Sequence, residues 1–491
     1  MEGNIWAWLW KISLGIYGVA VLLVALFGLL QVHLLIHYLL RKRKTSKQPA
    51  IRDFPVVTVQ LPIFNELYVA ARLIDQIVLL DYPHLEIQVL DDSTDKTKEI
   101  IAQKVKEYQT QGIDIVHIHR TNRSGYKAGA LEDALPMAKG EFIAIFDADF
   151  MPRPDFLRKL MPGFEDPQIG VVQTRWQHLN EDFGWLTRVQ ALLLNIHFVI
   201  EQVGRMNANL FLQFNGTGGI WRKATILDAG GWRADTLTED LDLSYRAQLK
   251  GWKIRYYPNV GAPAELPAEI HGLKSQQYRW MKGGAETAKL LLKPLWQSDQ
   301  RWLVKIQGTA HLLTSSVFVA IVVATIFSVP ASYSGFQFPK QIPLAWLSFL
   351  AMMGLSMNYF IANLNHAQLT GSVIVRFVKL LLIFPLFMAL SLGMSLHNAY
   401  AVIKGYFGQP SEFVRTPKFG LQSASGSFRK KSYFSAKLDK IVVFEGLLAI
   451  YFAFGWVHSW QMEQWGFVFF HGILVIGYGL IFLFSVRNSW V

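Results

Sequence analysis

A long polar block enclosed between apolar runs is the feature that most limits what this chain can fold into. The run 13–40 contains no Asp, Glu, Lys or Arg, and it is longer than the roughly 20 apolar residues that a membrane span needs. It is also too long for a signal-peptide core and lacks a small-residue cleavage site, so we expect it to be retained. Further apolar runs cover 309–330, 342–364, 441–460 and 465–486. The sequence therefore predicts a multi-pass membrane protein with one large polar domain after the first span.

Basic residues predict on which side of the membrane this domain lies. The cluster RKRKTSK, at 41–47, directly follows the first apolar run, and such clusters stay cytoplasmic. A net charge of +12 in a membrane protein reflects cytoplasmic loops more often than nucleic-acid binding, and no aromatic RNA-binding motif accompanies it. We therefore expect a protein of the cell membrane (inner or plasma membrane) with a cytoplasmic polar domain and no nucleic-acid partner. The lack of cysteine excludes disulfides, thiolate metal sites and thiol nucleophiles.

The run 372–403 allows two interpretations. It is apolar enough to span, but Arg376 and Lys379 interrupt its start and His397 its end. If it spans, the basic segment 404–440 faces outside; if it lies at the interface, that segment is cytoplasmic, as basic loops prefer. The interfacial interpretation is favoured, and it gives five spans, one before the polar domain and four after it.

Short apolar runs alternate with longer amphipathic ones from 55 to 260. We expect strands at 56–62, 85–92, 113–119 and 141–149, and helices at 66–80, 95–109 and 125–138. This alternation is typical of a mostly parallel α/β sheet. Ligands of such sheets bind outside the carboxyl ends of the strands, so the residues that follow the strands are where a site is expected.

Acidic pairs close two of the expected strands. Asp91 and Asp92 end the second strand, and Asp147 and Asp149 end the fourth. Aspartates at neighbouring strand ends converge on one crevice and repel each other, so a positive group should join them. Two carboxylates at positions i and i+2 can hold Mg²⁺ or Mn²⁺, which proteins bind through one or two carboxylates together with substrate phosphates. The sequence therefore predicts a divalent metal at Asp147 and Asp149.

No glycine-rich phosphate loop is present in the right context. A diphosphate would then be held by the metal and by cations such as Lys127 and Arg279, although Lys127 taken alone is explained more simply as a solvated helix residue. Thr238 is a good helix N-cap, and Glu239 and Asp240 complement the positive end of the helix that would follow. The same carboxylates could instead provide a general base that takes a proton from a sugar hydroxyl.

Four short motifs occur in a fixed order around this α/β block. They are Asp91-Asp92, Asp147-x-Asp149, Thr238-Glu239-Asp240 and Gln276-x-x-Arg279-Trp280. Lying in this order between membrane spans, they resemble the processive inverting family 2 β-glycosyltransferases of the cellulose synthase superfamily. The resemblance runs from 55 to 300. Stretches such as LDYPHLEIQVLDDSTD, GYKAGAL and FNGTGGIWR look most like the cellulose-synthase-like A and C groups, which make mannan or glucomannan and the glucan backbone of xyloglucan.

The resemblance implies a fold and a role for each motif. The fold would be α/β, with a GT-A-type (Rossmann-like) glycosyltransferase domain embedded in an α-helical transmembrane bundle. The catalytic carboxylates would be Asp240, as the base, and its neighbour Glu239. Donor-binding residues would be Asp91, Asp92, Lys127, Asp147, Arg279, Thr416 and Lys418, acceptor-binding residues Gln276, Trp280, Phe214 and Asn215, and metal ligands Asp147 and Asp149.

One more match lies beyond the polar domain. The stretch FVRTPK, at 413–418, resembles the FxVTxK gating loop of cellulose synthases, but Arg415 stands where the family has valine. The expected regions are an N-terminal span with its basic flank (1–47), the glycosyltransferase domain (48–260), interfacial helices with the QxxRW motif (261–300), membrane and interfacial helices (301–403), a cytoplasmic gating loop (404–440) and C-terminal spans (441–491).

The function that the resemblance implies is transfer of hexosyl units from a nucleotide sugar to the end of a growing β-linked glycan, with inversion and coupled to export. UDP-glucose is the favoured donor and GDP-mannose the alternative. Two other functions stay open: a non-processive transferase that glycosylates a membrane lipid, and a transporter or receptor with a cytoplasmic nucleotide-binding domain. Intramembrane charges would support the transporter, but the expected spans contain very few, and Glu445 is the clearest.

Overall fold

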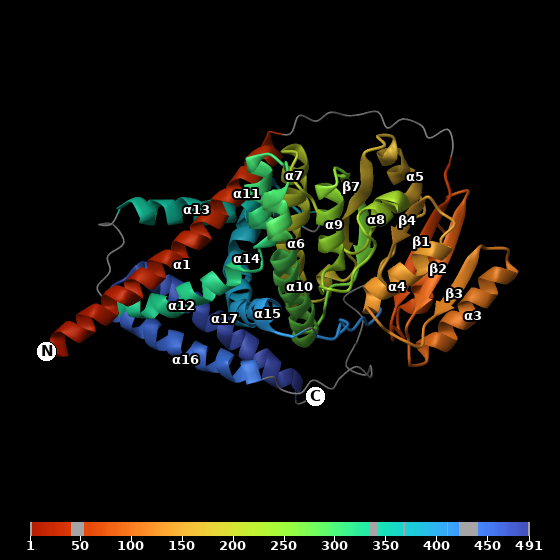
Figure 1. The fold of residues 1–491 in the computed structure, drawn as a ribbon. Coiled ribbons are helices and arrows are strands. Elements are labelled where there is room, and N and C mark those ends of the chain that lie inside the picture. The colour runs from red at the N-terminus through yellow and green to blue at the C-terminus, as the bar shows by residue number, and fades with distance from the viewer. Residues whose placement is uncertain are drawn as a thin grey trace.

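A computed structural model describes residues 2–40, 54–333, 342–366, 369–409, 411–421 and 440–489. Figure 1 shows a sheet domain at one end of the molecule and a group of long helices at the other, with the helix α10 between them. The basic cluster 41–47 and the segment 422–439 lie outside the described residues.

The sheet has seven strands in the order β3-β2-β1-β4-β6-β5-β7. Its strands are β1 Val57–Ile63, β2 Leu85–Asp91, β3 Ile115–His119, β4 Phe142–Ile145, β5 Ile169–His178, β6 Gly219–Arg222 and β7 Lys253–Ala264. β1 pairs in parallel with β2 and β4, β2 with β3, and β5 with β7, whereas β6 is antiparallel to both of its neighbours. The predicted mostly parallel α/β sheet is confirmed, and its order brings the carboxyl ends of β1, β2 and β4 together.

The fourth strand is shorter than the predicted 141–149. β4 ends at Ile145, although the next residue, Phe146, still donates its N–H to the Gln60 carbonyl of β1 at 3.2 Å. The chain then turns, and Phe150 N donates to the Asp147 carbonyl at 3.0 Å. The acidic pair therefore lies on a turn past the strand end, where its side chains face the edge of the sheet and not the ladder.

Helices cover both faces of the sheet. They are α2 Ala70–Ile77, α3 Thr97–Thr110, α4 Tyr126–Ala134, α5 Phe156–Leu160, α6 Trp185–Asn195, α7 Gln202–Asn207, α8 Lys223–Asp228 and α9 Glu239–Leu249, with a π-helix at Ile196–Glu201. The three predicted helices correspond to α2, α3 and α4. α2 begins later than predicted because a turn precedes it, in which Val69 N and Ala70 N both donate to the Glu66 carbonyl.

Alternation along the central strands divides the core into two layers. Val57, Val59 and Leu61 of β1 face one apolar cluster, and Ile143 and Ile145 of β4 face the other. All five are fully buried, as expected where successive side chains point to opposite faces of a sheet that is covered on both sides. Both faces are thus filled by core, and an open site is confined to the ends of the strands.

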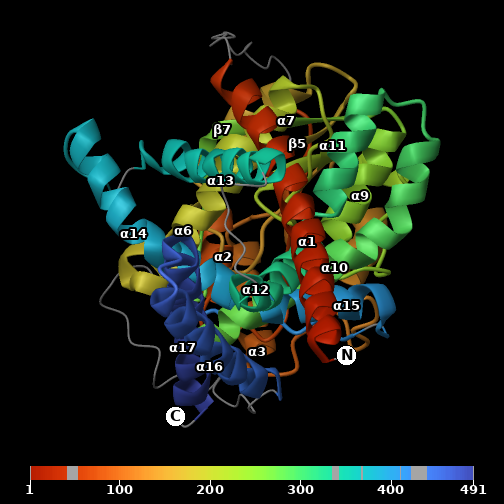
Figure 2. The same ribbon diagram turned by 90° about the vertical axis from the view of Figure 1, so that its left-hand side faces the viewer.

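The other long helices are α1 Glu2–Leu39, α10 Ile270–Gln297, α11 Trp302–Leu312, α12 Val317–Tyr333, α13 Ile342–Asn363, α14 Val373–Gly393, α15 Ser395–Phe407, α16 Lys440–Gln461 and α17 Trp465–Ser489. Within the described ranges, four stretches are long and apolar enough to cross a membrane: Trp10–Leu39, Val373–Phe407, Lys440–Gln461 and Trp465–Arg487. α11 and α12, which meet at a bend of 63°, form a fifth if they count as one span. Figure 2 shows α13 lying against α1, and α16 and α17 side by side.

This set differs from the predicted spans in two places. α13 was expected to span at 342–364 and is not among these stretches, whereas 372–403 was expected at the interface and is among them. α15, the last part of this stretch, packs against α10. Figure 1 shows α10 running across the direction of α12. If the bent pair counts as one span, the predicted set and the observed set both have an even number of spans between the sheet domain and residues 411–421. Either one leaves that segment on the side of the sheet domain.

Candidate functional site

Asp91, the last residue of β2, is fully buried and held by partners of the sheet itself. Its carboxylate accepts a hydrogen bond from Ser93 N at 2.8 Å, and Oδ2 lies 2.9 Å from His117 Nε2 and 3.1 Å from His119 Nδ1. The two histidines are two residues apart on β3 and so share a face. Burial raises the pKa of Asp91, but the hydrogen bonds from His117 and Ser93 together outweigh it and bring the pKa below its usual value.

Asp92 forms a two-point ion pair with Arg120. Arg120 Nε and Nη2 lie 2.8 and 2.7 Å from the two carboxylate oxygens. The same guanidinium donates to the Tyr126 carbonyl at 2.9 Å and to Asp133 at 2.8 Å. Tyr126 has a φ of 51°, in the left-handed region, and it directly precedes Lys127. The pair therefore fixes the turn that orients Lys127, while the predicted contact of Asp92 with a donor stays a prediction.

Lys127, at the start of α4, brings the acidic turn after β4 together with the start of α9. Its Nζ lies 2.6 Å from Asp147 Oδ1, 2.9 Å from the Gly216 carbonyl and 3.9 Å from Glu239 Oε1. Gly216 also lies close to Asp240, because a Cβ placed on Gly216 would lie 3.3 Å from Asp240 Oδ2. Burial lowers the pKa of Lys127, but the charges of Asp147 and Glu239 outweigh it and raise the pKa, so Lys127 is a cation here.

Glu239 and Asp240 lie in the first turn of α9, where Glu239 is buried and Asp240 is half-buried. Burial is the main cause that raises the pKa of Asp240 to about 7, the charge of Glu239 adds to it, and Lys127 opposes it. Burial also raises the pKa of Glu239, against the effect of Lys127. A carboxyl group whose pKa lies near neutrality can exchange a proton at working pH, which is the property that a general base needs.

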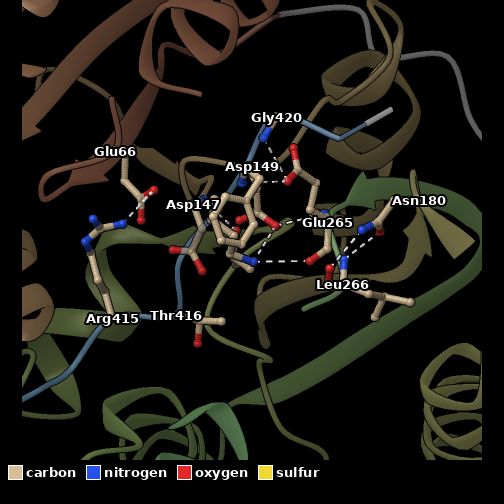
Figure 3. A network of polar contacts seen from close by, with 12 residues as sticks. Glu66, Asp147, Asp149, Asn180, Glu265, Leu266, Arg415, Thr416 and Gly420 are labelled. Carbon is tan, nitrogen blue, oxygen red and sulfur yellow. Dashed lines mark hydrogen bonds and ion pairs between the residues drawn. The ribbon is translucent and has the colours of Figure 1, made fainter. Parts of the chain in front are cut away.

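Asp149 is paired with a lysine from a distant part of the chain. Lys418 Nζ lies 2.7 Å from Asp149 Oδ2, and Glu265 N donates to the same oxygen at 2.9 Å. Figure 3 shows Asp149 together with two further carboxylates, Glu66 and Glu265, close to the segment 411–421. Burial raises the pKa of Glu66 to about 8, although Arg415, 3.3 Å away, lowers it.

The loop 411–421 also reaches the QxxRW helix, α10. Arg279 Nη2 donates to Thr416 Oγ1 at 2.7 Å, and its guanidinium lies 4.4 Å from the centre of the Phe413 ring. Burial lowers the pKa of Arg279, against the effect of the nearby carboxylates, of which Asp147 is the strongest. The helix α10 thus places Arg279 between the acidic turn after β4 and the loop 411–421.

Trp280, next along α10, lies among aromatic rings of the sheet domain. Its ring centre is 6.5 Å from that of Trp176 on β5, and Trp176 is in turn 5.6 Å from Phe150 and 5.3 Å from Phe198. Gln276, one turn earlier on α10, is half-buried. The four rings thus form one aromatic cluster between α10 and the sheet domain.

The two residues predicted from the FNGTGG stretch have different positions. Phe214 is fully buried, and its ring packs edge-on against Trp221 at 5.4 Å within the core. Its ring therefore belongs to the core, and its predicted role in acceptor binding stays a prediction. Asn215 is closer to the expectation. Its Oδ1 accepts from His197 and Gln213, while its buried Nδ2 has no hydrogen-bond partner among the described residues.

Three parts of the site were not foreseen from the sequence. Glu66 and Glu265 contact the loop, and the ring of Trp176 lies near that of Trp280. Glu66 lies four residues after the end of the predicted strand 56–62, so its position near a strand end was the available signal. Glu265 follows β7, which was not predicted, and no local pattern singles it out.

Two groups of side chains could hold a divalent metal. Asp147 and Asp149 offer carboxylate oxygens, the ligands that suit Mg²⁺ and Mn²⁺, and the Asp147 side chain is 36% exposed. Asp91, His117 and His119 offer donor atoms within 4.8 Å of one another, and imidazole suits transition metals. The second group is the more enclosed, and Asp91 Oδ2 already bonds to both histidines. A metal at Asp147 and Asp149 stays a prediction.

Comparisons with known proteins agree with this geometry. A family model described as "Glycosyltransferase like family 2" matches residues 55–283. Glucomannan 4-beta-mannosyltransferase 1 of Oryza sativa subsp. japonica is 34% identical over 457 residues, 87% of this chain and 83% of the relative. Glucomannan 4-beta-mannosyltransferase 2 of Arabidopsis thaliana is 36% identical over 385 residues, 76% of this chain and 70% of the relative.

A solved structure shares the fold. It is a mannosyltransferase from Pyrobaculum calidifontis in complex with GDP-Man and Mn²⁺, which matches with a TM-score of 0.56 at 18% identity and covers 82% of this chain and 100% of that one. The sheet order, the residues at the strand ends and the identity over most of the plant enzymes' length lead to one conclusion. The chain belongs to glycosyltransferase family 2, within the cellulose synthase superfamily, and is a hexosyltransferase with a GT-A-type domain next to apolar helices that can span a membrane.

Proposed function

We propose that this protein transfers mannosyl units from GDP-mannose to the end of a β-linked glycan, with inversion at the anomeric carbon. The curated relatives that support this are named glucomannan 4-beta-mannosyltransferases. The sequence motifs are compatible with both donors, and UDP-glucose is the one that the sequence analysis favours. The plant relatives shift the preference to GDP-mannose.

The observation that carries the proposal is the position of Asp240. Inversion in one displacement requires a base that removes a proton from the acceptor hydroxyl while that oxygen attacks the anomeric carbon. Asp240 has its pKa raised to about 7 and lies next to the Lys127–Asp147 pair. It can accept the proton at neutral pH, and a positioned base contributes on the order of 10² to 10⁴ in rate.

The leaving group is a nucleoside diphosphate, which gains charge as the sugar departs. Lys127, Arg279 and Lys418 are the cations that line the acidic turn after β4. They can stabilise that charge, as fixed cations do in other transfers to or from phosphate. Asp147 and Asp149 would hold the divalent metal, which would neutralise part of the diphosphate charge when bound. The metal is Mg²⁺ or Mn²⁺ in this proposal, because the ligands are oxygens.

The acceptor would lie against α10. Trp280 and Trp176 offer ring faces to a sugar, and Gln276 and Asn215 offer polar groups near them. Stacking on an indole does not require a fixed pattern of hydroxyls, so it can hold the chain end through successive additions. We therefore propose processive elongation, with the product passing into the group of membrane helices and the sheet domain on the cytoplasmic side of the cell membrane.

The test uses the purified protein with Mg²⁺ or Mn²⁺ and each labelled donor in turn, GDP-mannose or UDP-glucose. We expect incorporation from GDP-mannose into a product that a β-1,4-mannanase degrades. Incorporation from UDP-glucose alone, into a product that only a glucanase degrades, would contradict the choice of donor.

Product size separates a polymer from a glycolipid. A ladder or an insoluble glycan supports processive synthesis. If every labelled product partitions into organic solvent as a lipid with one or two sugars, the acceptor is a membrane lipid and the processive part of the proposal is wrong.

A further inference from the structure

Glu265, the residue directly after β7, holds the loop 411–421 by its backbone. Glu265 Oε2 accepts hydrogen bonds from the N–H groups of Phe419 and Gly420, at 3.3 and 3.1 Å. Its other oxygen, Oε1, accepts from Arg72 Nη2 of α2 at 2.7 Å. The Glu265 side chain is only 2% exposed, so a carboxylate that is almost closed off from water has the loop as one of its two partners.

The backbone of Glu265 is connected to the same part of the site. Its N–H donates to Asp149 Oδ2 at 2.9 Å, and its carbonyl accepts from Lys418 Nζ at 3.2 Å. Lys418 Nζ also lies 2.7 Å from that Asp149 oxygen. Figure 3 shows Glu265 next to both Asp149 and Gly420. One residue therefore touches the loop, the loop lysine and the predicted metal ligand.

The close approach at Gly420 is a separate sign that this contact is built into the chain. Gly420 has a φ of +69°, and a Cβ on it would lie 3.1 Å from the Tyr68 carbonyl. A residue with a side chain would be strained in this conformation and crowded by the backbone that follows β1. Glycine lets the loop come near enough for its N–H to reach Glu265.

We propose that Glu265 is a positioning residue that keeps the loop docked independently of donor and metal. The charged contacts of the loop, Lys418 with Asp149 and Arg415 with Glu66, use groups that a cation or a diphosphate would compete for. Glu265, in contrast, is only 2% exposed and its carboxylate is already paired with Arg72, so neither ligand readily reaches its contact with the loop. With the loop held at 419–420, the lysine one residue away can exchange Asp149 for a diphosphate while the loop stays in place.

The test follows the loop directly, without sugar transfer. The chain has no cysteine, so Val414→Cys provides a single attachment point for a nitroxide label. Val414 is 60% exposed, and a label there leaves the docking contacts in place. The electron paramagnetic resonance line shape, measured without donor or metal, reports whether the loop is immobile. Glu265→Met should lower the docked-to-undocked ratio by about tenfold, because two N–H groups lose their acceptor.

Three further variants distinguish docking from a general loss of structure. Glu265→Gln keeps an acceptor oxygen and should keep most of the immobile signal. Arg72→Met removes the ion pair but not the acceptor, and should also stay docked. Glu181→Met is the matched control, since Glu181 is a buried glutamate of the same domain that pairs with His366 at 3.1 Å. It should leave the label unchanged.

The outcomes decide the proposal. An immobile label in Glu265→Met overturns it. The label in Glu265→Gln or Arg72→Met could instead be as mobile as the label in Glu265→Met. That result would show that charge, and not acceptance of the N–H groups, holds the loop, and it also overturns the proposal. Only the step in which Lys418 turns to a diphosphate rests on the proposed function; the label measurement uses no donor, so it stands if transfer from GDP-mannose fails.

Discussion

Two aspartate pairs follow strands of the same sheet, yet their partners differ in kind. The pair after β2 is compensated by groups fixed in the sheet domain: two histidines of β3 bond Asp91, and Arg120 holds Asp92 at two points. The pair after β4 is compensated by lysine ammonium groups, one from the start of α4 and one from the loop 411–421. In sequence both are simply acidic residues at a strand end.

The difference teaches which pair can change partners. A planar guanidinium bound at two points is oriented and costly to remove, whereas an ammonium on a flexible stem is a point charge that other cations can replace. We therefore expect the pair after β2 to act mainly as a fixed frame, and the pair after β4 to be the one that accepts a metal. The predictions below test this contrast, in order of expected effect.

The largest effect is expected at Asp240, which Lys127 connects to the exchangeable pair. Asp240→Asn keeps the shape of the side chain but removes its basicity, so mannosyl transfer should fall by about 10² to 10⁴. Donor binding should be kept, because the charges that face the diphosphate remain. The measurement is the initial rate of transfer from labelled GDP-mannose, with GDP affinity determined by calorimetry. Near-normal transfer would exclude this carboxylate as the base.

The next effect concerns stability and the fixed pair. Arg120→Met leaves Asp92 buried without its partner, which should cost about 3 kcal/mol of the free energy of unfolding. Lys418→Met should cost about 1 kcal/mol, because Asp149 Oδ2 keeps the hydrogen bond from Glu265 N. Thermal unfolding of both variants in the same detergent compares them. Equal losses would remove the distinction between the two pairs.

A smaller effect is expected on metal-dependent binding. Asp149→Asn should weaken GDP binding in the presence of Mn²⁺ by about tenfold, or about 1.4 kcal/mol, because one predicted metal ligand loses its charge. Without metal, the variant and the wild type should bind GDP alike. Asp91→Asn is the comparison at the other pair, and its response to Mn²⁺ should match that of the wild type. If Asp91→Asn were the one to lose the response, the metal would belong to the Asp91, His117 and His119 group.

Sequence patterns predicted the first half of the sheet better than the second. β1 to β4 alternate with helices, so their strand ends, and with them Asp91 and Asp147, could be read from local pattern. β6 runs antiparallel and β5 pairs with a strand about 80 residues later in the chain, and no local signal specifies such pairings. Glu265 and Trp176 belong to this half, which explains why neither was foreseen.

Side-chain packing also limited what could be predicted. Phe214 and Asn215 are neighbours in one motif, but the ring is enclosed in the core while the amide lies in a polar network with His197. Burial decides between these outcomes, and burial depends on segments far away. The loop is the opposite case: its match to a gating motif placed Thr416 and Lys418 at the site, and the structure adds the contacts of each with Arg279 and Asp149.

The smallest effect is a shift in pH dependence. Asp240 must lose its proton to act as a base, so transfer should rise with pH through about 7. The charge of Glu239 raises the pKa of Asp240, and Glu239→Gln removes that charge. The rising limb of the pH–rate profile should therefore move to lower pH in this variant. A limb that stays in place, or moves up, would show that the titrating group is not Asp240.

Stability gives an independent check with a definite sign. The pKa of Asp240 is raised from 3.8 to about 7 on folding, so the folded state holds this proton more tightly than the unfolded chain does. The stabilisation from this group is complete below pH 3.8 and is lost as pH rises through about 7. Asp240→Asn has no such proton to lose. The melting temperature of the variant should therefore rise relative to that of the wild type between pH 5 and pH 8. A difference between the two melting temperatures that stays constant over this range would contradict the raised pKa that makes Asp240 a base at neutral pH.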